Sequence, residues 1–265
     1  FLMGATSGRT TLNGEGLQHQ DGHSLLFASA YPSCRAYDPT FAYEVAVLVQ
    51  NGLEEMYGRG EDVFYYITLL NENYTQPPMP DGAEEGIQRG MYLFSSPESG
   101  EADIQLMGSG SILREVIAAA KLLKEEYNIG ANVWSVLGIN QLHREGMMIS
   151  EWNRLHPDKP RKKSHVETQL NGAKGPVVIS TDNVCAYAEQ IRSQIELPLT
   201  ILGTDGYGRS DTREVLRHFF GVDRYHIVVS ALKALADEEK ISLNSVAEAI
   251  DKFGIDPNLP HPLTC

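Results

Sequence analysis

Short apolar runs alternate with longer amphipathic stretches in the part of the chain that follows residue 101. The apolar runs at residues 102–107, 132–137, 176–180 and 198–202 predict strands. Apolar residues at three- and four-residue spacing predict helices at residues 111–127, 139–156 with a break near Gly146, 184–194, 211–219, 225–239 and 242–253. Strands that alternate with helices of this length favour an α/β fold with parallel doubly wound sheets.

The first hundred residues show the same two patterns with less regularity. We expect a short helix at residues 24–31, a strand at 34–37, a helix at 40–57 and a strand at 63–70. The last run, VFYYITLL, is β-branched or aromatic on both faces, which is typical of a buried parallel strand. Polar residues 71–74 and 76–82 follow it, where α/β sheets place ligand-binding loops. Residues 95–100, SSPESG, have the composition of a linker.

One segment, residues 4–24, shows neither pattern. It contains five glycines and almost no aliphatic side chains, and long loops of this kind are usually functional or disordered. Because it continues into the apolar residues 25–28, which should be buried, we interpret it as an anchored functional loop. Only residues 1–3 precede it, so we expect no strand or helix before it, as in a chain cut from a longer protein.

Four chemically active side chains, Glu15, His19, Asp21 and His23, lie within nine positions of this segment. On a helix, Glu15, His19 and His23 would share one face and could bind a metal ion, but the glycines argue against a helix. Histidine titrates near neutrality and a neighbouring carboxylate tunes it, so acid–base or substrate-orienting chemistry suits these residues better. The alternative is that they satisfy the backbone of a long packed loop.

Two further glycine-rich turns follow expected strands. MGSGS at residues 107–111 has the position of a dinucleotide-binding turn, but Leu113 replaces the last glycine and no acidic residue ends the next strand. The alternative is a tight turn whose Ser111 caps the following helix. GTDGYGRS at residues 203–210 suggests either the rim of a site or a plain turn, with residues 210–212 capping the helix after it.

The formal charge of −13 over 265 residues disfavours a nucleic-acid partner, because phosphate binding needs clustered Lys and Arg. The basic residues 159–163 fit a solvated loop better than a polyanion-binding patch. The cysteines at positions 34, 185 and 265 lack CxxC spacing, which favours a reducing cytoplasm over a disulfide framework. No run approaches the roughly 20 apolar residues of a membrane span, and no charged-then-apolar leader opens the chain. The histidines at positions 156, 165, 218, 226 and 261 are scattered singly, so we expect surface or packing roles for them.

Five long segments of the chain resemble one known family. They are TSGRTTLNGEGLQHQDGHS, AYDPTFAYEVAVLVQNGLEEMYG, YYITLLNENYTQPPMPDGAEEGI, MGSGSILREV and LGTDGYGRSDTREVLRHFF. They are similar to the homodimeric bacterial pyruvate dehydrogenases, the decarboxylating components of the pyruvate dehydrogenase complex. The resemblance covers essentially the whole of this chain but only the last part of the family's chain.

The resemblance implies that residues 1–97 are the later portion of a pyrimidine-binding middle domain and residues 98–265 a transketolase-like C-terminal domain. It also implies thiamin diphosphate and Mg as cofactors of the parent enzyme and pyruvate as its substrate. The implied partners are a second copy in a homodimer and the dihydrolipoyl acetyltransferase core. The family holds its cofactor with a GDG motif and a later Asn, and no GDG occurs here. We therefore expect this chain alone to lack the cofactor grip.

The resemblance identifies His19 with the family's active-centre histidine and Glu15 with an acidic residue at the same entrance. Asp21 and His23 are their neighbours and further candidates for this site. The parent enzyme would be a cytoplasmic oxidoreductase that decarboxylates pyruvate and reductively acetylates a lipoyl group. Two alternatives stay open: an inert assembly or dimerisation module as an isolated chain, and a dinucleotide-binding protein built on residues 107–111.

Overall fold

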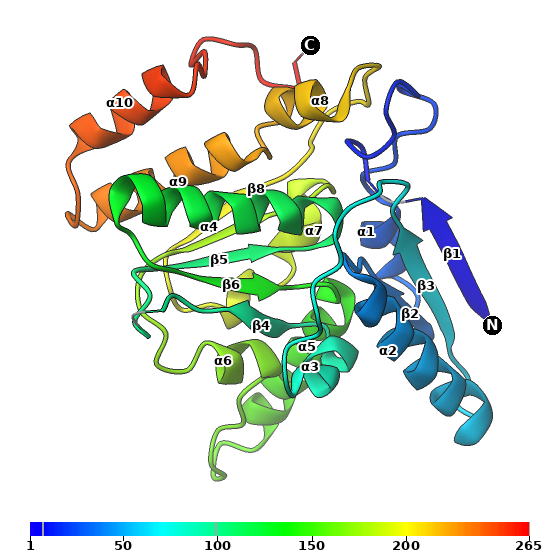
Figure 1. The fold of residues 1–265 in the computed structure, drawn as a ribbon. Helices are drawn as coiled ribbons and strands as arrows, with labels where there is room; N and C mark the ends of the chain where they lie inside the picture. The colour runs from blue at the N-terminus through cyan, green and yellow to red at the C-terminus, as the bar shows by residue number, and fades with distance from the viewer. Residues whose placement is uncertain (7, 99, 265) are drawn as a thin grey trace.

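A computed structural model describes residues 1–6, 8–98 and 100–264. Ser7, Ser99 and Cys265 lie outside the described residues, so the segments expected at 4–24 and 95–100 are each described except for one residue. Two sheets lie next to each other with helices packed around them (Figure 1). The expected α/β class, with mainly parallel sheets, is confirmed.

The first sheet has three parallel strands, β1 (Leu2–Thr6), β2 (Cys34–Tyr37) and β3 (Phe64–Leu69), in the order β1-β3-β2. The strands expected at 34–37 and 63–70 are confirmed. The expectation that no strand precedes the glycine-rich segment is wrong, because β1 pairs with β3 along its whole length. The pattern of side chains could not reveal β1, since it is short, contains a glycine and leaves Leu2 and Met3 exposed. Backbone pairing with β3 defines it instead.

Three helices accompany this sheet: α1 (Ser24–Ala28), α2 (Ala42–Leu53), which continues through a π-helical turn (Glu54–Gly58), and α3 (Ala83–Arg89). The helices expected at 24–31 and 40–57 are confirmed, the first ending earlier than expected. The helix α3 was not expected. Leu48 of α2 and Ile87 of α3 are buried in one cluster with Tyr65 of β3, so these two helices cover one face of the sheet.

The second sheet has five strands in the order β4-β6-β5-β7-β8. They are β4 (Tyr92–Ser95), β5 (Ile104–Gly108), β6 (Ala131–Ser135), β7 (Val177–Ser180) and β8 (Leu199–Leu202). All four expected strands are present with ends shifted by at most three residues, and they pair in parallel. The strand β4 was not expected and pairs antiparallel with β6 at the edge of the sheet. A division between two domains near residue 97 stays a prediction.

The helices of the second part are α4 (Leu113–Tyr127), preceded by a 3-10 turn (Gly110–Ile112), α5 (Ile139–Leu155), α6 (His165–Gln169), α7 (Cys185–Glu189), a 3-10 turn (Arg192–Gln194), α8 (Arg213–Phe219), α9 (Arg224–Asp237) and α10 (Leu243–Lys252). The break expected near Gly146 is wrong, because α5 is continuous. A Cβ at Gly146 would collide with the side chain of Gln194, so this glycine permits close packing and does not end the helix. In the described part of the chain, no helix is long and apolar enough to cross a membrane.

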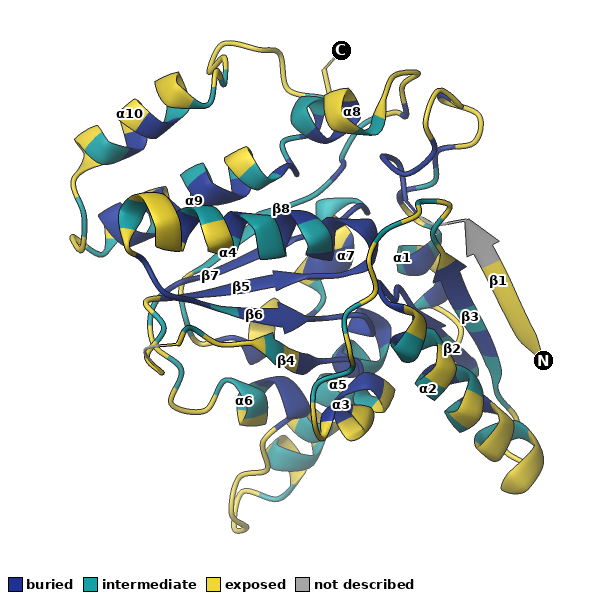
Figure 2. Ribbon diagram, in the orientation of Figure 1, coloured by how far each residue is buried: buried dark blue, intermediate teal, exposed yellow. Residues whose placement is uncertain are grey.

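Both faces of the second sheet are buried along its central strands β5 and β7, and β5 is dark over its whole length in Figure 2. Along β5, Leu106 packs in a cluster with α4 and α9, whereas Met107 packs on the opposite face in a cluster with α5 and α7. This second cluster also contains Cys34 and Ala36 of β2. The two sheets therefore share a hydrophobic core, which fixes β2 relative to β5 and β7.

Candidate functional site

The candidate site is built on the histidine loop, which we define as residues 8–23, between β1 and α1. Its base lies against the second sheet. Gly8 has a φ of 62°, and a Cβ there would collide with the carboxylate of Asp182, so the position requires glycine on two grounds. The backbone N–H of Thr10 donates to both oxygens of Asp182, at 3.1 and 3.2 Å. Asp182 follows β7, so a carboxylate at the end of the second sheet holds a loop that leaves the first.

Asp182 is fully buried, and this burial raises its pKa to about 6, although the Arg217 charge and hydrogen bonds from Thr10 and Ser111 act in the opposite direction. The Ser111 hydroxyl donates to Asp182 at 3.0 Å. The expectation that Ser111 caps α4 is therefore wrong, because its side chain serves this carboxylate. Asp182 was not among the expected site residues, although the polar residues 181–183 directly after a buried strand are a readable signal.

A second set of contacts clamps the loop from residues 203–213. The Gln20 side chain accepts from the backbone N–H of Arg209 at 2.8 Å and donates to a carbonyl of its own loop. The backbone N–H of Arg213 donates to the side chain of Asn13 at 3.2 Å, and Gly14 donates to the carbonyl of Asp211 at 2.9 Å. The two glycine-rich segments that sequence analysis considered separately thus lie against each other. The expected cap is present too, since Thr212 caps α8.

The side chain of Arg9, which was not among the expected site residues, reaches from the histidine loop to residues 203–206. It is buried, and its guanidinium donates to the carbonyl of Gly206 while leaving no room for a side chain at Gly22. Burial lowers the pKa of Arg9, and the charges of three nearby aspartates, Asp21 first, oppose that shift. The signal in the sequence that could have identified Arg9 is the presence of an arginine within a glycine-rich loop. Arg9 therefore attaches the base of the histidine loop to residues 203–206.

Above this base, the tip of the loop presents Glu15 and His19 to solvent. The Nδ1 atom of His19 lies 3.0 Å from a carboxylate oxygen of Glu15, and their side chains are 60% and 50% exposed. Gly14 and Gly16, with φ of 75° and 78°, give the tip turns that ordinary residues rarely adopt. The structure thus brings the two principal candidates together as an exposed histidine–carboxylate pair on a clamped base.

Asp21 and His23 form a separate pair. Asp21 accepts from the backbone N–H groups of His23 and Ser24, at 3.0 and 3.1 Å, and from the Ser24 hydroxyl, so it stabilises the start of α1. The His23 ring is 3.8 Å from Asp21 and packs edge-on against Phe27. Within the described residues, no hydrogen bond or ion pair joins these side chains to Glu15 or His19.

The MGSGS turn at residues 107–111 is enclosed by acidic side chains. Ser109 donates to Asp38 at 2.8 Å, a Cβ at Gly110 would meet the same carboxylate, and Ser111 contacts Asp182. Ser109 and Ser111 are buried. Two buried carboxylates repel a diphosphate, so the geometry argues against a dinucleotide at this turn.

The polar residues 71–74, expected among ligand loops, are held by arginines of the second part of the chain. Glu72 pairs with Arg114 at 2.6 Å, with Arg213 at 3.4 Å and with Arg217. The Glu72 and Arg217 side chains are both buried. This segment therefore joins the two sheets through charge, close to the residues that clamp the histidine loop.

Among the described residues, the histidine loop does not offer a magnesium site. The described residues contain one group of three side chains that could bind a metal ion, and it lies elsewhere, at the junction of α8 and α9. It consists of His218, Asp223 and His226. Mg²⁺ prefers oxygen ligands in octahedral geometry, and the carboxylates of Asp21 and Asp182 are occupied by backbone and hydroxyl donors. The donors of the histidine loop thus suit Mg²⁺ poorly. What the loop offers is a histidine–carboxylate pair that can hold and move a proton.

Comparison with known proteins matches two families along the chain. "Pyruvate dehydrogenase E1 component middle domain" matches residues 1–77, and "Transketolase-like TK C-terminal domain" matches residues 90–223. The chain is 56% identical over 267 residues to the pyruvate dehydrogenase E1 component of Pseudomonas aeruginosa and 50% identical over 264 residues to that of Escherichia coli K12. These alignments cover 100% and 99% of this chain but only 30% of each relative, so the chain spans about 30% of their length.

A solved structure with a similar fold is the transketolase of Campylobacter jejuni. The TM-score is 0.63 at 18% sequence identity, over 88% of this chain and 31% of that one. At this identity the similarity concerns the fold alone.

Proposed function

Because the chain belongs to the transketolase-like C-terminal domain family and corresponds to the C-terminal portion of bacterial pyruvate dehydrogenase E1 components, we propose that it forms one wall of such an enzyme's active centre. The parent enzyme would oxidatively decarboxylate pyruvate and reductively acetylate the lipoyl group of a dihydrolipoyl acetyltransferase. The observation that supports this role is the exposed Glu15–His19 pair on a loop clamped at its base from two sides.

Thiamin diphosphate would supply the electron-sink chemistry that decarboxylation needs. The chain's own contribution is placement and proton traffic. His19 would orient or protonate the pyruvate-derived oxygen or the lipoyl sulfur, and Glu15, 3.0 Å from its Nδ1, would hold the ring and its tautomer. Asp21 and His23 would shape the neighbouring surface, since Asp21 is engaged at the start of α1.

The remaining parts of this proposal rest on sequence similarity. The cofactor grip, with Mg and the diphosphate, would lie in parts of the enzyme that correspond to the other 70% or so of the relatives' length. We propose a homodimer, attachment to the acetyltransferase core and a cytoplasmic location, as in the family that the sequence resembles. Binding to nucleic acid or to a membrane is not part of the proposed function.

The decisive experiment replaces His19 by Ala in the full-length enzyme. We expect turnover to fall by about 10²- to 10⁴-fold, the usual contribution of a general acid–base group, with unchanged affinity for thiamin diphosphate. Glu15→Gln should give a smaller loss, because it keeps a hydrogen-bond acceptor beside the ring. His156→Ala is the matched control, since that histidine stacks on Trp152 far from the loop in sequence. Unchanged turnover in His19→Ala would refute the assignment.

The second candidate function is an inert assembly or dimerisation module, for the isolated chain. It is motivated by the sequence, which lacks the GDG motif of the family's cofactor grip. Calorimetry of this chain with thiamin diphosphate and Mg²⁺ tests the second candidate. Tight Mg-dependent binding to the isolated chain would refute it.

A further inference from the structure

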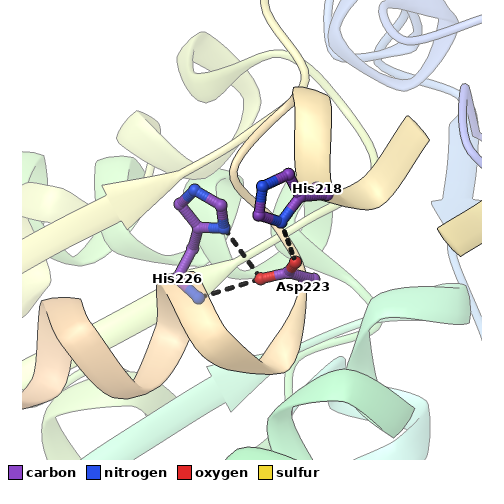
Figure 3. Close-up of side chains that lie close together, drawn as sticks. All are labelled: His218, Asp223 and His226. Atoms are coloured by element: carbon purple, nitrogen blue, oxygen red, sulfur yellow. Dashed lines mark hydrogen bonds and ion pairs between the residues drawn. The ribbon is translucent and has the colours of Figure 1, made fainter. Parts of the chain in front are cut away.

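The junction between α8 and α9 brings together three side chains that are far from the histidine loop in sequence (Figure 3). His218 lies in the last turn of α8, Asp223 directly precedes α9, and His226 lies in the first turn of α9. The Nδ1 atom of His218 is 2.9 Å from one oxygen of Asp223, and the Nδ1 atom of His226 is 2.8 Å from the other. Their ligand atoms all lie within 4.8 Å of one another. Although they are scattered singly in the sequence, the fold thus brings His218 and His226 together; the surface or packing role expected for them stays a prediction.

The backbone fixes this arrangement. Gly221 has a φ of 67°, which reverses the chain between the two helices, and Val222 next to it is fully buried in the core. Asp223 accepts from the backbone N–H of His226 at 2.9 Å and so caps α9. This hydrogen bond orients the carboxylate, in the manner of the outer-shell partners that orient metal ligands in proteins.

We propose that His218, Asp223 and His226 form a binding site for a zinc ion. Two imidazoles and one carboxylate are a donor set that suits Zn²⁺, and a fourth position is then left for water. The nitrogen-rich set disfavours Mg²⁺ and Ca²⁺, which take oxygen ligands. Without metal, each Nδ1–H donates to the carboxylate; Zn²⁺ would replace these two protons, which move to the Nε2 atoms, and small shifts of the rings would bring all three ligands to bonding distance.

The surroundings are compatible with a dication. The three side chains are 36%, 11% and 22% exposed, so the ligands are held in place while an ion can still enter. Two arginines are close in sequence, but Arg224 pairs with Glu115 at 2.8 Å and Arg217 with the same carboxylate at 3.5 Å. Glu115 thereby offsets part of their charge, and the buried Glu72 also pairs with Arg217. The net charge of −13 further favours the approach of cations.

Calorimetric titration of the chelator-treated chain with ZnCl₂ tests the proposal. We expect one ion per chain and a melting temperature that rises with zinc concentration, because the ion ties α8 to α9 in the folded state. Titration with Co²⁺ should give the intense visible absorption of a four-coordinate site. The absence of both zinc binding and this absorption would overturn the proposal.

Three variants locate the ion. His218→Gln and His226→Gln each remove one ligand, and Asp223→Asn removes the anionic ligand while keeping a good helix cap, so that it should fold. Each should weaken zinc binding by more than about 10-fold, the loss expected even for an outer-shell partner. His19→Gln is the control, because it disrupts a histidine–carboxylate pair outside the proposed zinc site and should leave zinc binding unchanged. Binding that survives the three variants, or is lost in His19→Gln alone, would contradict the assignment.

Discussion

At the scale of single residues, Asp182 connects two parts of the candidate site. It receives the Thr10 backbone from one side and the Ser111 hydroxyl from the other, so a single carboxylate joins the histidine loop to the MGSGS turn. Its burial disfavours the charged form, whereas the donors around it favour that form. This balance makes the attachment of the loop sensitive to pH.

The raised pKa of Asp182 predicts a specific pH dependence of stability. The folded state holds a proton on Asp182 up to about pH 6, whereas the unfolded chain releases it near 3.8, so folded stability should fall as the pH rises through this window. At roughly 1.4 kcal/mol per pKa unit, the loss is on the order of 3 kcal/mol.

Asp182→Asn should abolish this contribution while keeping one acceptor for Thr10. Urea unfolding of both proteins between pH 4 and 7, roughly the window set by these pKa values, gives the difference. Parallel pH profiles for the two proteins would show that Asp182 does not titrate as described.

At the scale of elements, the sequence was informative wherever side-chain burial defines a strand or helix. The runs that became β5 and β7 alternate between two buried faces, and the amphipathic pattern of α4 matches its buried side. The sequence was uninformative where backbone pairing or local contacts determine whether a segment forms a strand or a helix. β1 is held by hydrogen bonds to β3 while Leu2 and Met3 are exposed, and Gly146 faces Gln194 inside a continuous helix. The short helix α6 was missed although Ser164 and Glu167 form a readable capping box.

In the candidate site, too, some residues could be identified from the local sequence and others only from contacts in the fold. Glu15 and His19 were found because their residue types and spacing are visible in the loop itself. Arg9 and Asp182 were not, since their importance depends on contacts with residues almost 200 positions away, such as that between Arg9 and Gly206. The roles of the four candidate residues in catalysis stay predictions.

The histidine loop as an element should depend on the glycine at its base. Gly8→Ala should destabilise the protein by roughly 1–3 kcal/mol or more, since it combines a positive φ with a collision at Asp182. Gly14→Ala is the matched control: its φ is 75°, but a Cβ there meets nothing within 4 Å. Thermal unfolding and hydrogen exchange of residues 8–23 measure the effect. Equal losses in the two variants would show that contact with Asp182 is unimportant.

At the scale of the whole molecule, the two sheets are joined by a shared core and by charge. Cys34 and Ala36 of β2 pack with residues of the second sheet, and Glu72 after β3 pairs with three arginines of α4 and α8. We therefore expect both sheets to unfold in one transition. The arrangement also explains why the histidine loop has a fixed base although it lies between two sheets.

Glu72→Gln tests this connection. It leaves the buried Arg217 without its closest carboxylate, and breaking a buried ion pair in this way typically costs about 3–5 kcal/mol. Glu101→Gln removes the exposed pair with Lys174 and should have little effect. Urea unfolding, followed by tryptophan fluorescence and by hydrogen exchange in β3, measures both stability and coupling. Wild-type transitions that differ between the two probes would contradict a single cooperative unit.

The clamp on the histidine loop also has a consequence for the order of events during protein synthesis. The loop emerges from the ribosome early in this chain, whereas its contacts with Arg213 span 200 residues. At about 5–20 residues per second, translation takes on the order of 10–40 s to supply the second half of the clamp. During that interval Glu15 and His19 belong to a nascent segment without its support, exposed to chaperones and proteases. The site can acquire its geometry only after residues 203–213, at the start of α8, have been made.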